Sequence, residues 1–120
     1  MQLKSKSLSG VVQPLSYVDR MLRQQGFTRA DGESSPSYDV IIFDSATSTS
    51  YFLRIPTRYQ LPSSSTGELK VRIGQPSLEA MEQLKAISLH ISFIPTPIRL
   101  AAEHKLAEIA DYLNRPPKAT

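Results

Sequence analysis

The sequence contains no cysteine. Disulfide bonds, thiolate metal ligands and cysteine nucleophiles are therefore excluded. It also lacks any apolar run approaching the ~18–20 residues that a membrane-spanning helix needs. Lys4 and Lys6 are not followed by a continuous apolar stretch, which argues against a secretory signal peptide. These absences predict a cytoplasmic protein with no membrane partner.

The net positive charge of the chain comes from its two ends. The net charge is +3, but four of the 14 basic residues lie in segments that we expect to be mobile ends, at about residues 1–9 and 115–120. These four are Lys4, Lys6, Arg115 and Lys118. The rest of the chain carries ten basic and eleven acidic residues. Because binding to a phosphate backbone needs a concentrated basic surface, we expect no nucleic-acid partner.

The length and the apolar content predict one domain over residues 1–120. A chain of 120 residues is near the common size for a single hydrophobic core. An apolar fraction of 40% is enough to form such a core.

The segment Tyr51–Pro56 is predicted to be the middle strand of a sheet. Tyr51, Leu53 and Ile55 alternate with Phe52 and Arg54, the period-two pattern of a strand that buries one face. Pro56 lacks an N–H, so we expect regular pairing to weaken there. The segments 38–44 and 68–73 have suitable lengths and residue types to pair with this strand. In the second of them, the alternation predicts that Leu69, Val71 and Ile73 point inward.

Helical spacing marks the two ends of the chain. An amphipathic helix is predicted with Pro14 in its first turn and Gly26 as its left-handed C-terminal cap. A final helix is predicted to begin with Thr96 as N-cap and Pro97 in its first turn. Its predicted buried stripe is Ile98, Ala101, Ala102, Leu106, Ile109 and Leu113.

Four further short elements complete the expected fold. A contact or strand at 11–12, a strand at 27–30, a short helix at 77–85 and a strand at 87–94 are predicted. The expected fold class is α+β, with a single antiparallel sheet of about four to five strands packed on N- and C-terminal helices.

Several short motifs resemble the YugN-like family of small uncharacterised bacterial proteins. They are the helix at 15–27 ending in Gly-Phe, the run Phe52-Leu53-Arg54-Ile55-Pro56, the run Leu69-Lys70-Val71-Arg72-Ile73-Gly74-Gln75-Pro76, and the closing amphipathic helix. The resemblance implies an α+β fold. It supplies no activity, cofactor or catalytic residue, so no cofactor is expected.

Motifs of catalysis and metal binding are missing from the sequence. There is no HExxH, glycine-rich phosphate loop, EF-hand loop or dinucleotide-binding fingerprint. His90 lies between Ser88 and Ser92 on one face of a predicted strand, but a serine–histidine pair needs an orienting carboxylate and oxyanion donors. His104 is interpreted as a solvated side chain in the final helix. We therefore predict no catalytic residue and no metal site.

The polar face of the predicted sheet is the candidate ligand or interface surface. Its members are Phe52, Arg54, Lys70, Arg72 and His90. Such a face is ordinarily solvated, with arginine and lysine stems covering apolar surface. Alternatively, it receives an anionic ligand or a peptide.

The strand at 38–44 suggests an assembly. Its residues Val40–Phe43 place apolar side chains on both faces of the strand. The predicted helices cover one of these faces, so the other face stays exposed to solvent. We therefore interpret the protein as a non-enzymatic cytosolic binding or assembly module, a homodimer that also takes a protein or peptide partner. The alternative is a small enzyme or anion-ligand-binding protein that uses the basic polar face.

Overall fold

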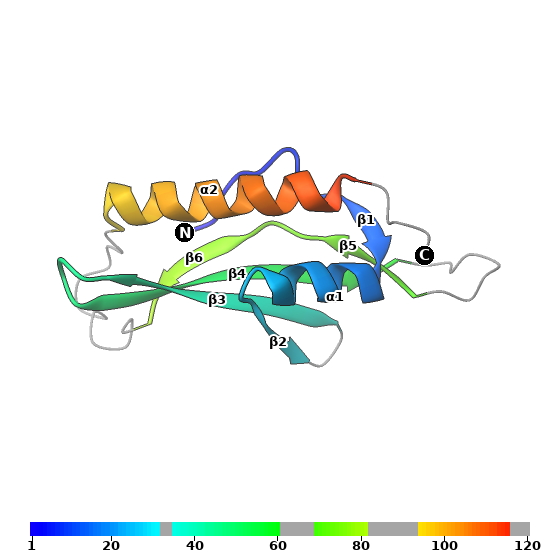
Figure 1. The fold of residues 1–120 in the computed structure, drawn as a ribbon, viewed down its shortest axis with the longest axis horizontal. Coiled ribbons are helices and arrows are strands. Elements are labelled where there is room, and N and C mark those ends of the chain that lie inside the picture. Colours follow the sequence, from blue (N-terminus) through cyan, green and yellow to red (C-terminus); the bar gives the residue numbers. More distant parts are fainter. Residues whose placement is uncertain (32–34, 61–68, 82–93, 116–120) are drawn as a thin grey trace.

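The computed structural model describes residues 1–31, 35–60, 69–81 and 94–115. Two helices and six strands are defined within these ranges (Figure 1). The strands are β1 (Val12–Pro14), β2 (Thr28–Asp31), β3 (Pro36–Asp44), β4 (Thr49–Tyr59), β5 (Lys70–Ile73) and β6 (Ser77–Ala80); the helices are α1 (Leu15–Gln24) and α2 (Thr96–Leu113). The predicted α+β class is confirmed, with six described strands rather than four to five.

β4 is the centre of the sheet, as the alternation at 51–56 predicts. The strand order is β1-β5-β4-β3-β2, β6 also pairs with β4, and every pairing is antiparallel. Tyr51, Leu53 and Ile55 are buried, with at most 4% of each side chain exposed. We call the side of the sheet that carries these residues the inner face, and the opposite side the outer face.

Pro56 does not end β4, which continues to Tyr59. On one side of β4, β6 pairs with residues 51–54 and β5 pairs with residues 57–59. The N–H of Gly74 donates to Pro56 O at 2.9 Å on this same side. Because the nitrogen and carbonyl oxygen of one residue in an antiparallel strand point toward the same neighbour, the missing N–H of Pro56 falls between β6 and β5. Pairing is therefore interrupted at Pro56 on one side only.

α1 begins at Leu15, with Pro14 as its N-cap instead of in its first turn, and it ends as its sequence predicts. Gly26 has φ +91°, the left-handed conformation that favours glycine. The N–H of Phe27 donates to Leu22 O at 2.9 Å, and the N–H of Gly26 donates to Arg23 O at 3.0 Å. These two bonds form a Schellman motif, which turns the chain directly into β2.

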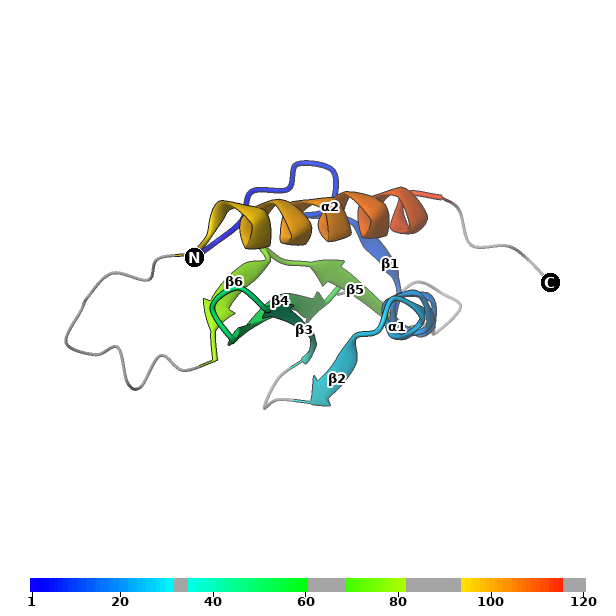
Figure 2. The ribbon, with the colours of Figure 1, turned by 60° about the vertical axis from the view of Figure 1, so that its left-hand side comes forward.

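α2 lies across the inner face of the sheet (Figures 1 and 2). Its buried residues are Ile98, Ala102, Leu106, Ile109, Ala110 and Leu113. The predicted stripe is correct except that Ala110 replaces Ala101, which is exposed. The helix begins at Thr96, so Pro95 rather than Thr96 is its N-cap, and no side chain caps it. The hydroxyl of Tyr17 in α1 donates to Tyr112 O at 2.9 Å and joins the two helices.

The predicted helix at 77–85 is wrong where the structure describes it. Residues 77–80 form β6, in which Leu78 lies opposite Leu53 and Ala80 lies opposite Tyr51. Leu78 is fully buried in the core, so pairing with β4 overrides the helical spacing of Leu78 and Met81. Residues 82–85 lie outside the described residues, as does the predicted strand at 87–94 except for Ile94, which is buried just before α2.

The first residues of the chain are packed, whereas we expected residues 1–9 to be a mobile end. Leu3 and Leu8 are 4% and 0% exposed. The N–H of Leu3 donates to Pro76 O at 2.9 Å, and the N–H of Gly10 donates to Ile73 O at 2.8 Å. The physical reason is that two separated leucines provide apolar burial even in a polar segment. Lys4 and Lys6 therefore belong to the packed part of the chain. Of the other expected end, residues 116–120 lie outside the described residues.

The strand preceding Gly74 is shorter than predicted. β5 begins at Lys70, and Val71 and Ile73 are buried as expected. Leu69 is 46% exposed instead of pointing inward, and its carbonyl oxygen accepts the N–H of Leu15 at 2.8 Å. Among the described residues, no helix is both long and apolar enough to span a membrane.

Candidate functional site

The outer face of the sheet carries an exposed apolar cluster at one end. Ile41 and Phe52 lie opposite each other on β3 and β4, and Phe43 follows two residues along β3. Met81 comes directly after β6, whose Glu79 lies opposite Phe52. Ile41, Phe43 and Met81 are 61%, 60% and 51% exposed, and Phe52 is half-buried. We call Ile41, Phe43, Phe52 and Met81 the apolar cluster.

A shallow hollow accompanies the apolar cluster. It has a volume of about 490 Å³, and its lining includes Thr28, Ile41, Phe52 and Met81. Asp39 and Arg54 form its polar side. The hollow is thus apolar where the cluster lies and charged at one margin.

Arg54 lies at the polar margin of this hollow. Its Nε donates to Asp39 Oδ1 at 2.8 Å and its Nη2 donates to Asp39 Oδ2 at 3.1 Å, a bidentate pair. The guanidinium carbon lies 5.3 Å from the centroid of the Phe52 ring, in cation–π contact. The hydrogen bonds to Asp39 raise the pKa of Arg54. The charge of Arg54 is therefore compensated within the sheet, and its position is fixed.

The predicted site residues fall into two groups on the outer face. Phe52 and Arg54 touch each other at the apolar end. Lys70 and Arg72 lie on β5, beside the last residues of β4. Arg72 donates to Gln60 Oε1 at 3.2 Å and to Gly10 O at 3.3 Å. His90 lies outside the described residues. The structure therefore does not bring the described candidates together into one site.

Arg58 is an outer-face residue that the sequence analysis did not include. It lies on β4 directly opposite Arg72, and it is exposed. It was missed because the strand was expected to weaken at Pro56. The signal is nevertheless present in the sequence, since Phe52, Arg54, Pro56 and Arg58 are spaced by two residues and share one face of a continuous strand.

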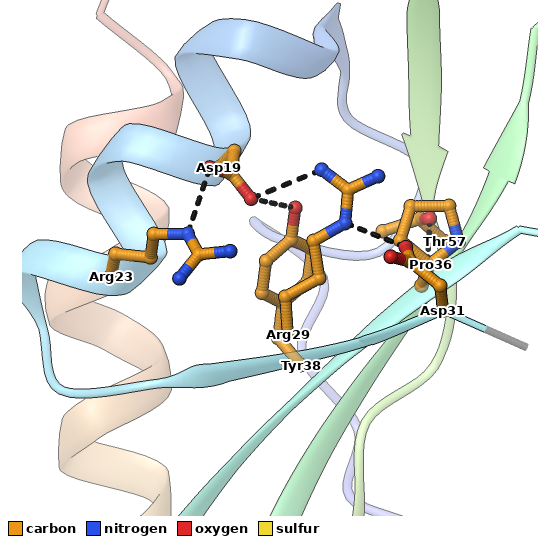
Figure 3. Close-up of polar contacts among 7 residues, drawn as sticks. All are labelled: Asp19, Arg23, Arg29, Asp31, Pro36, Tyr38 and Thr57. Atoms are coloured by element: carbon orange, nitrogen blue, oxygen red, sulfur yellow. Dashed lines mark hydrogen bonds and ion pairs between the residues drawn. The ribbon is translucent and has the colours of Figure 1, made fainter.

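A second polar group lies between α1 and the edge of the sheet, and its members range from the fully buried Tyr38 to the exposed Arg23 (Figure 3). Asp19 Oδ1 accepts the hydroxyl of Tyr38 at 2.9 Å and Arg29 Nη1 at 3.3 Å, and its Oδ2 accepts Arg23 Nε at 2.9 Å. Burial alone would raise the pKa of Asp19, but the hydrogen bonds from Tyr38, Arg23 and Arg29 together lower it. The pKa of Tyr38 is raised, mainly by burial and also by the hydrogen bond to Asp19.

This network is interpreted as structural rather than catalytic. Tyr38 is fully buried, so a ligand in solution does not reach its hydroxyl. The nearby hydroxyl of Thr57, another buried polar group, donates to Pro36 O at 2.6 Å. Each of these buried hydroxyls is satisfied within the protein. The network holds α1 against β2 and β3.

Replacing Asp19 by asparagine should lower the free energy of unfolding at neutral pH by about 1.5–3 kcal/mol, the range for hydrogen bonds to a charged group. A lowered pKa in the folded state gives stability that is present above the unfolded pKa near 3.8 and is lost as the pH falls through the folded pKa. Urea unfolding of both proteins between pH 7 and pH 2 measures this. The difference between them should shrink below about pH 4; a constant difference would contradict the assigned role of the charge.

The described ranges contain no group of three or more histidine, aspartate or glutamate side chains placed to hold a metal ion. His104 is exposed on α2.

Comparison with solved structures relates the fold to a known protein. The chain is similar to the uncharacterized conserved protein YugN from Geobacillus kaustophilus HTA426, with a TM-score of 0.72 over 94% of each chain and 16% sequence identity. No protein-family model and no curated protein matches the chain. The likeness supports, at the level of the fold, the resemblance to the YugN-like family that the sequence motifs indicate. It supplies no activity, because that protein is itself described as uncharacterized.

Proposed function

We propose that this protein is a non-enzymatic binding module of the cytoplasm that assembles as a homodimer through the outer face of its sheet. The observation that carries the proposal is the apolar cluster. Three of its four side chains are more than half exposed, and the described residues leave them uncovered. Contiguous exposed apolar patches of a few hundred Å² usually mark interaction sites.

A second copy of the chain is the occupant that fits this surface. The outer face is apolar around Ile41 and Phe52, and basic around Arg58 and Arg72 at its other end. A two-fold axis through the apolar end brings the two clusters together and keeps the two basic ends apart. The Asp39–Arg54 pair lies at the boundary and is already satisfied, so burial near it leaves no unpaired charge.

The chemistry of the outer face supports binding rather than catalysis. A general base must be free to take a proton from a substrate. Asp39 is the carboxylate that lines the hollow, and both of its oxygens accept hydrogen bonds from Arg54. Phe52 and Ile41 provide area for binding but no reactive group.

Phe52→Glu should dissociate the dimer. An unpaired carboxylate at the centre of the interface should weaken association by about 30-fold or more, since central interface residues commonly contribute ~2 kcal/mol. Light scattering at micromolar concentration measures the mass. The native protein should have twice the 13.4 kDa of one chain, and the variant should have 13.4 kDa. Circular dichroism should show unchanged secondary structure in the variant.

Leu100→Glu is the matched control. Leu100 is 53% exposed on α2, away from the outer face, so the same change of charge should leave the dimer intact. A native mass of 13.4 kDa would contradict the proposal. A dimer that tolerates Phe52→Glu would place the interface elsewhere. If the native chain is monomeric and Phe52→Glu strongly destabilises it, the apolar cluster is covered from within the same chain and the proposal is wrong.

A further inference from the structure

Two arginines face each other at the basic end of the outer face. Arg58 on β4 and Arg72 on β5 are direct cross-strand partners. Side chains in such a pair begin only ~4.5–5.5 Å apart, and like charges directly opposite each other are unfavourable. Lys70 lies two residues from Arg72 on the same face of β5. Three positive charges are thus held close together by the strand register.

These charges are not compensated by the described part of the protein. Its ion pairs involve other cations, and no described carboxylate lies within ion-pair distance of Arg58, Lys70 or Arg72. The partners of Arg72 are the amide oxygen of Gln60 and the carbonyl oxygen of Gly10, both neutral. These bonds hold the guanidinium in place without neutralising it. Arg54, by contrast, has Asp39 as its counterion.

Space for a ligand lies beside Arg58. A hollow of about 540 Å³ is lined by Ser35, Ser37, Pro56, Arg58 and Tyr59, among others, where β4 runs on beyond the start of β3. The hydroxyl of Ser35 donates to Thr57 O at 2.6 Å, whereas the hydroxyl of the half-buried Ser37 has no hydrogen-bond partner among the described residues. A ligand at Arg58 therefore has room beside it.

We propose that Arg58 and Arg72 form a binding site for a phosphate-bearing anion, to which Lys70 adds attraction. Planar guanidinium groups bind phosphate oxygens in bidentate fashion, and two of them on adjacent strands can take one phosphate group from two sides. The bound anion supplies the counter-charge that the arginine pair lacks. This site is at the opposite end of the outer face from the apolar cluster, so it does not depend on the proposed dimer.

The proposed site also revises the expectation that the chain has no concentrated basic surface for phosphate. Lys4 and Lys6 belong to the packed part of the chain, so two of the four basic residues that were assigned to mobile ends lie in the folded body. A small net charge does not prevent a local basic site, because phosphate contacts act over short range. The close placement of Arg58, Lys70 and Arg72, and not the total charge of the chain, favours anion binding.

Titration with inorganic pyrophosphate, followed by amide chemical shifts at low ionic strength, tests the site. We expect saturable shifts at Arg58, Arg72 and Gln60, and at least a fivefold weaker affinity in both Arg58→Gln and Arg72→Gln. Both side chains are exposed, so these variants should fold. Arg99→Gln is the control for loss of one arginine charge, because the Arg99 side chain is 42% exposed on α2, and this substitution should leave the affinity unchanged.

Three other outcomes would overturn the proposal, and a fourth would support it. Shifts no larger than those caused by sodium chloride at equal ionic strength would show charge screening alone. Pyrophosphate binding that survives in both glutamine variants would place the anion elsewhere. Oligo-glutamate binding without pyrophosphate binding would assign the arginine pair to acidic peptides. Oligothymidylate binding that is lost in both variants would support the site and identify a nucleic-acid backbone as a source of the phosphate.

Discussion

Leu53→Ala should lower the free energy of unfolding by about 2–5 kcal/mol, the range for truncating a buried leucine. Leu53 is fully buried on β4, between Val40 of β3 and Leu78 of β6 in the register of the sheet. Truncation leaves a cavity that neighbours on three strands can fill only by moving the sheet. Chemical denaturation, with an unchanged dependence on denaturant concentration, measures the loss.

Arg72→Ala is the comparison for Leu53→Ala. Arg72 is exposed and makes hydrogen bonds only to neutral acceptors among the described residues, so its removal should cost less than ~1 kcal/mol. Equal losses for the two variants would mean that the inner and outer faces of the sheet are wrongly assigned at Leu53 on β4 or at Arg72 on β5.

Leu8→Ala should have an effect of similar size, about 2–5 kcal/mol. Leu8 is fully buried, and the backbone on either side of it is bonded to residues 73 and 76 through Gly10 and Leu3. A mobile N-terminal end would give no loss of stability at all. The variant therefore distinguishes the packed segment from the free end that the sequence suggested.

Lys6→Ala provides the control for Leu8→Ala. Lys6 lies in the same segment but is exposed, so its truncation should change the unfolding free energy by less than ~0.5 kcal/mol. Denaturation of the two variants under the same conditions measures both. A loss below ~1 kcal/mol for Leu8→Ala would contradict the packing of residues 1–9.

The elements that the sequence predicted correctly are those whose signals are local. The Gly26 cap, the stripe of α2 and the alternation around Leu53 each depend on residues within one element. The segment at 77–80 is different, because Leu78 satisfies both helical and strand spacing, and β4 decides between them by pairing with it. The burial of Leu8 likewise depends on a distant surface that no local pattern reveals.

The candidate site was predicted in part for the same reason. Phe52 and Arg54 were assigned to one face, and the structure places them there in contact with each other. Arg58 was omitted because a proline usually ends regular pairing. Its inclusion requires knowing that the missing N–H of Pro56 falls between β6 and β5, which only the sheet topology supplies.

The most direct test of the proposed assembly uses nuclear Overhauser effects between two copies of the chain. A sample that mixes isotope-labelled and unlabelled protein, observed with isotope filtering, reports contacts between molecules only. The homodimer predicts contacts from the Ile41 methyl groups of one copy to the Phe52 ring of the other. Contacts confined to α1 or α2, or an absence of intermolecular contacts at millimolar concentration, would contradict the outer face as the interface.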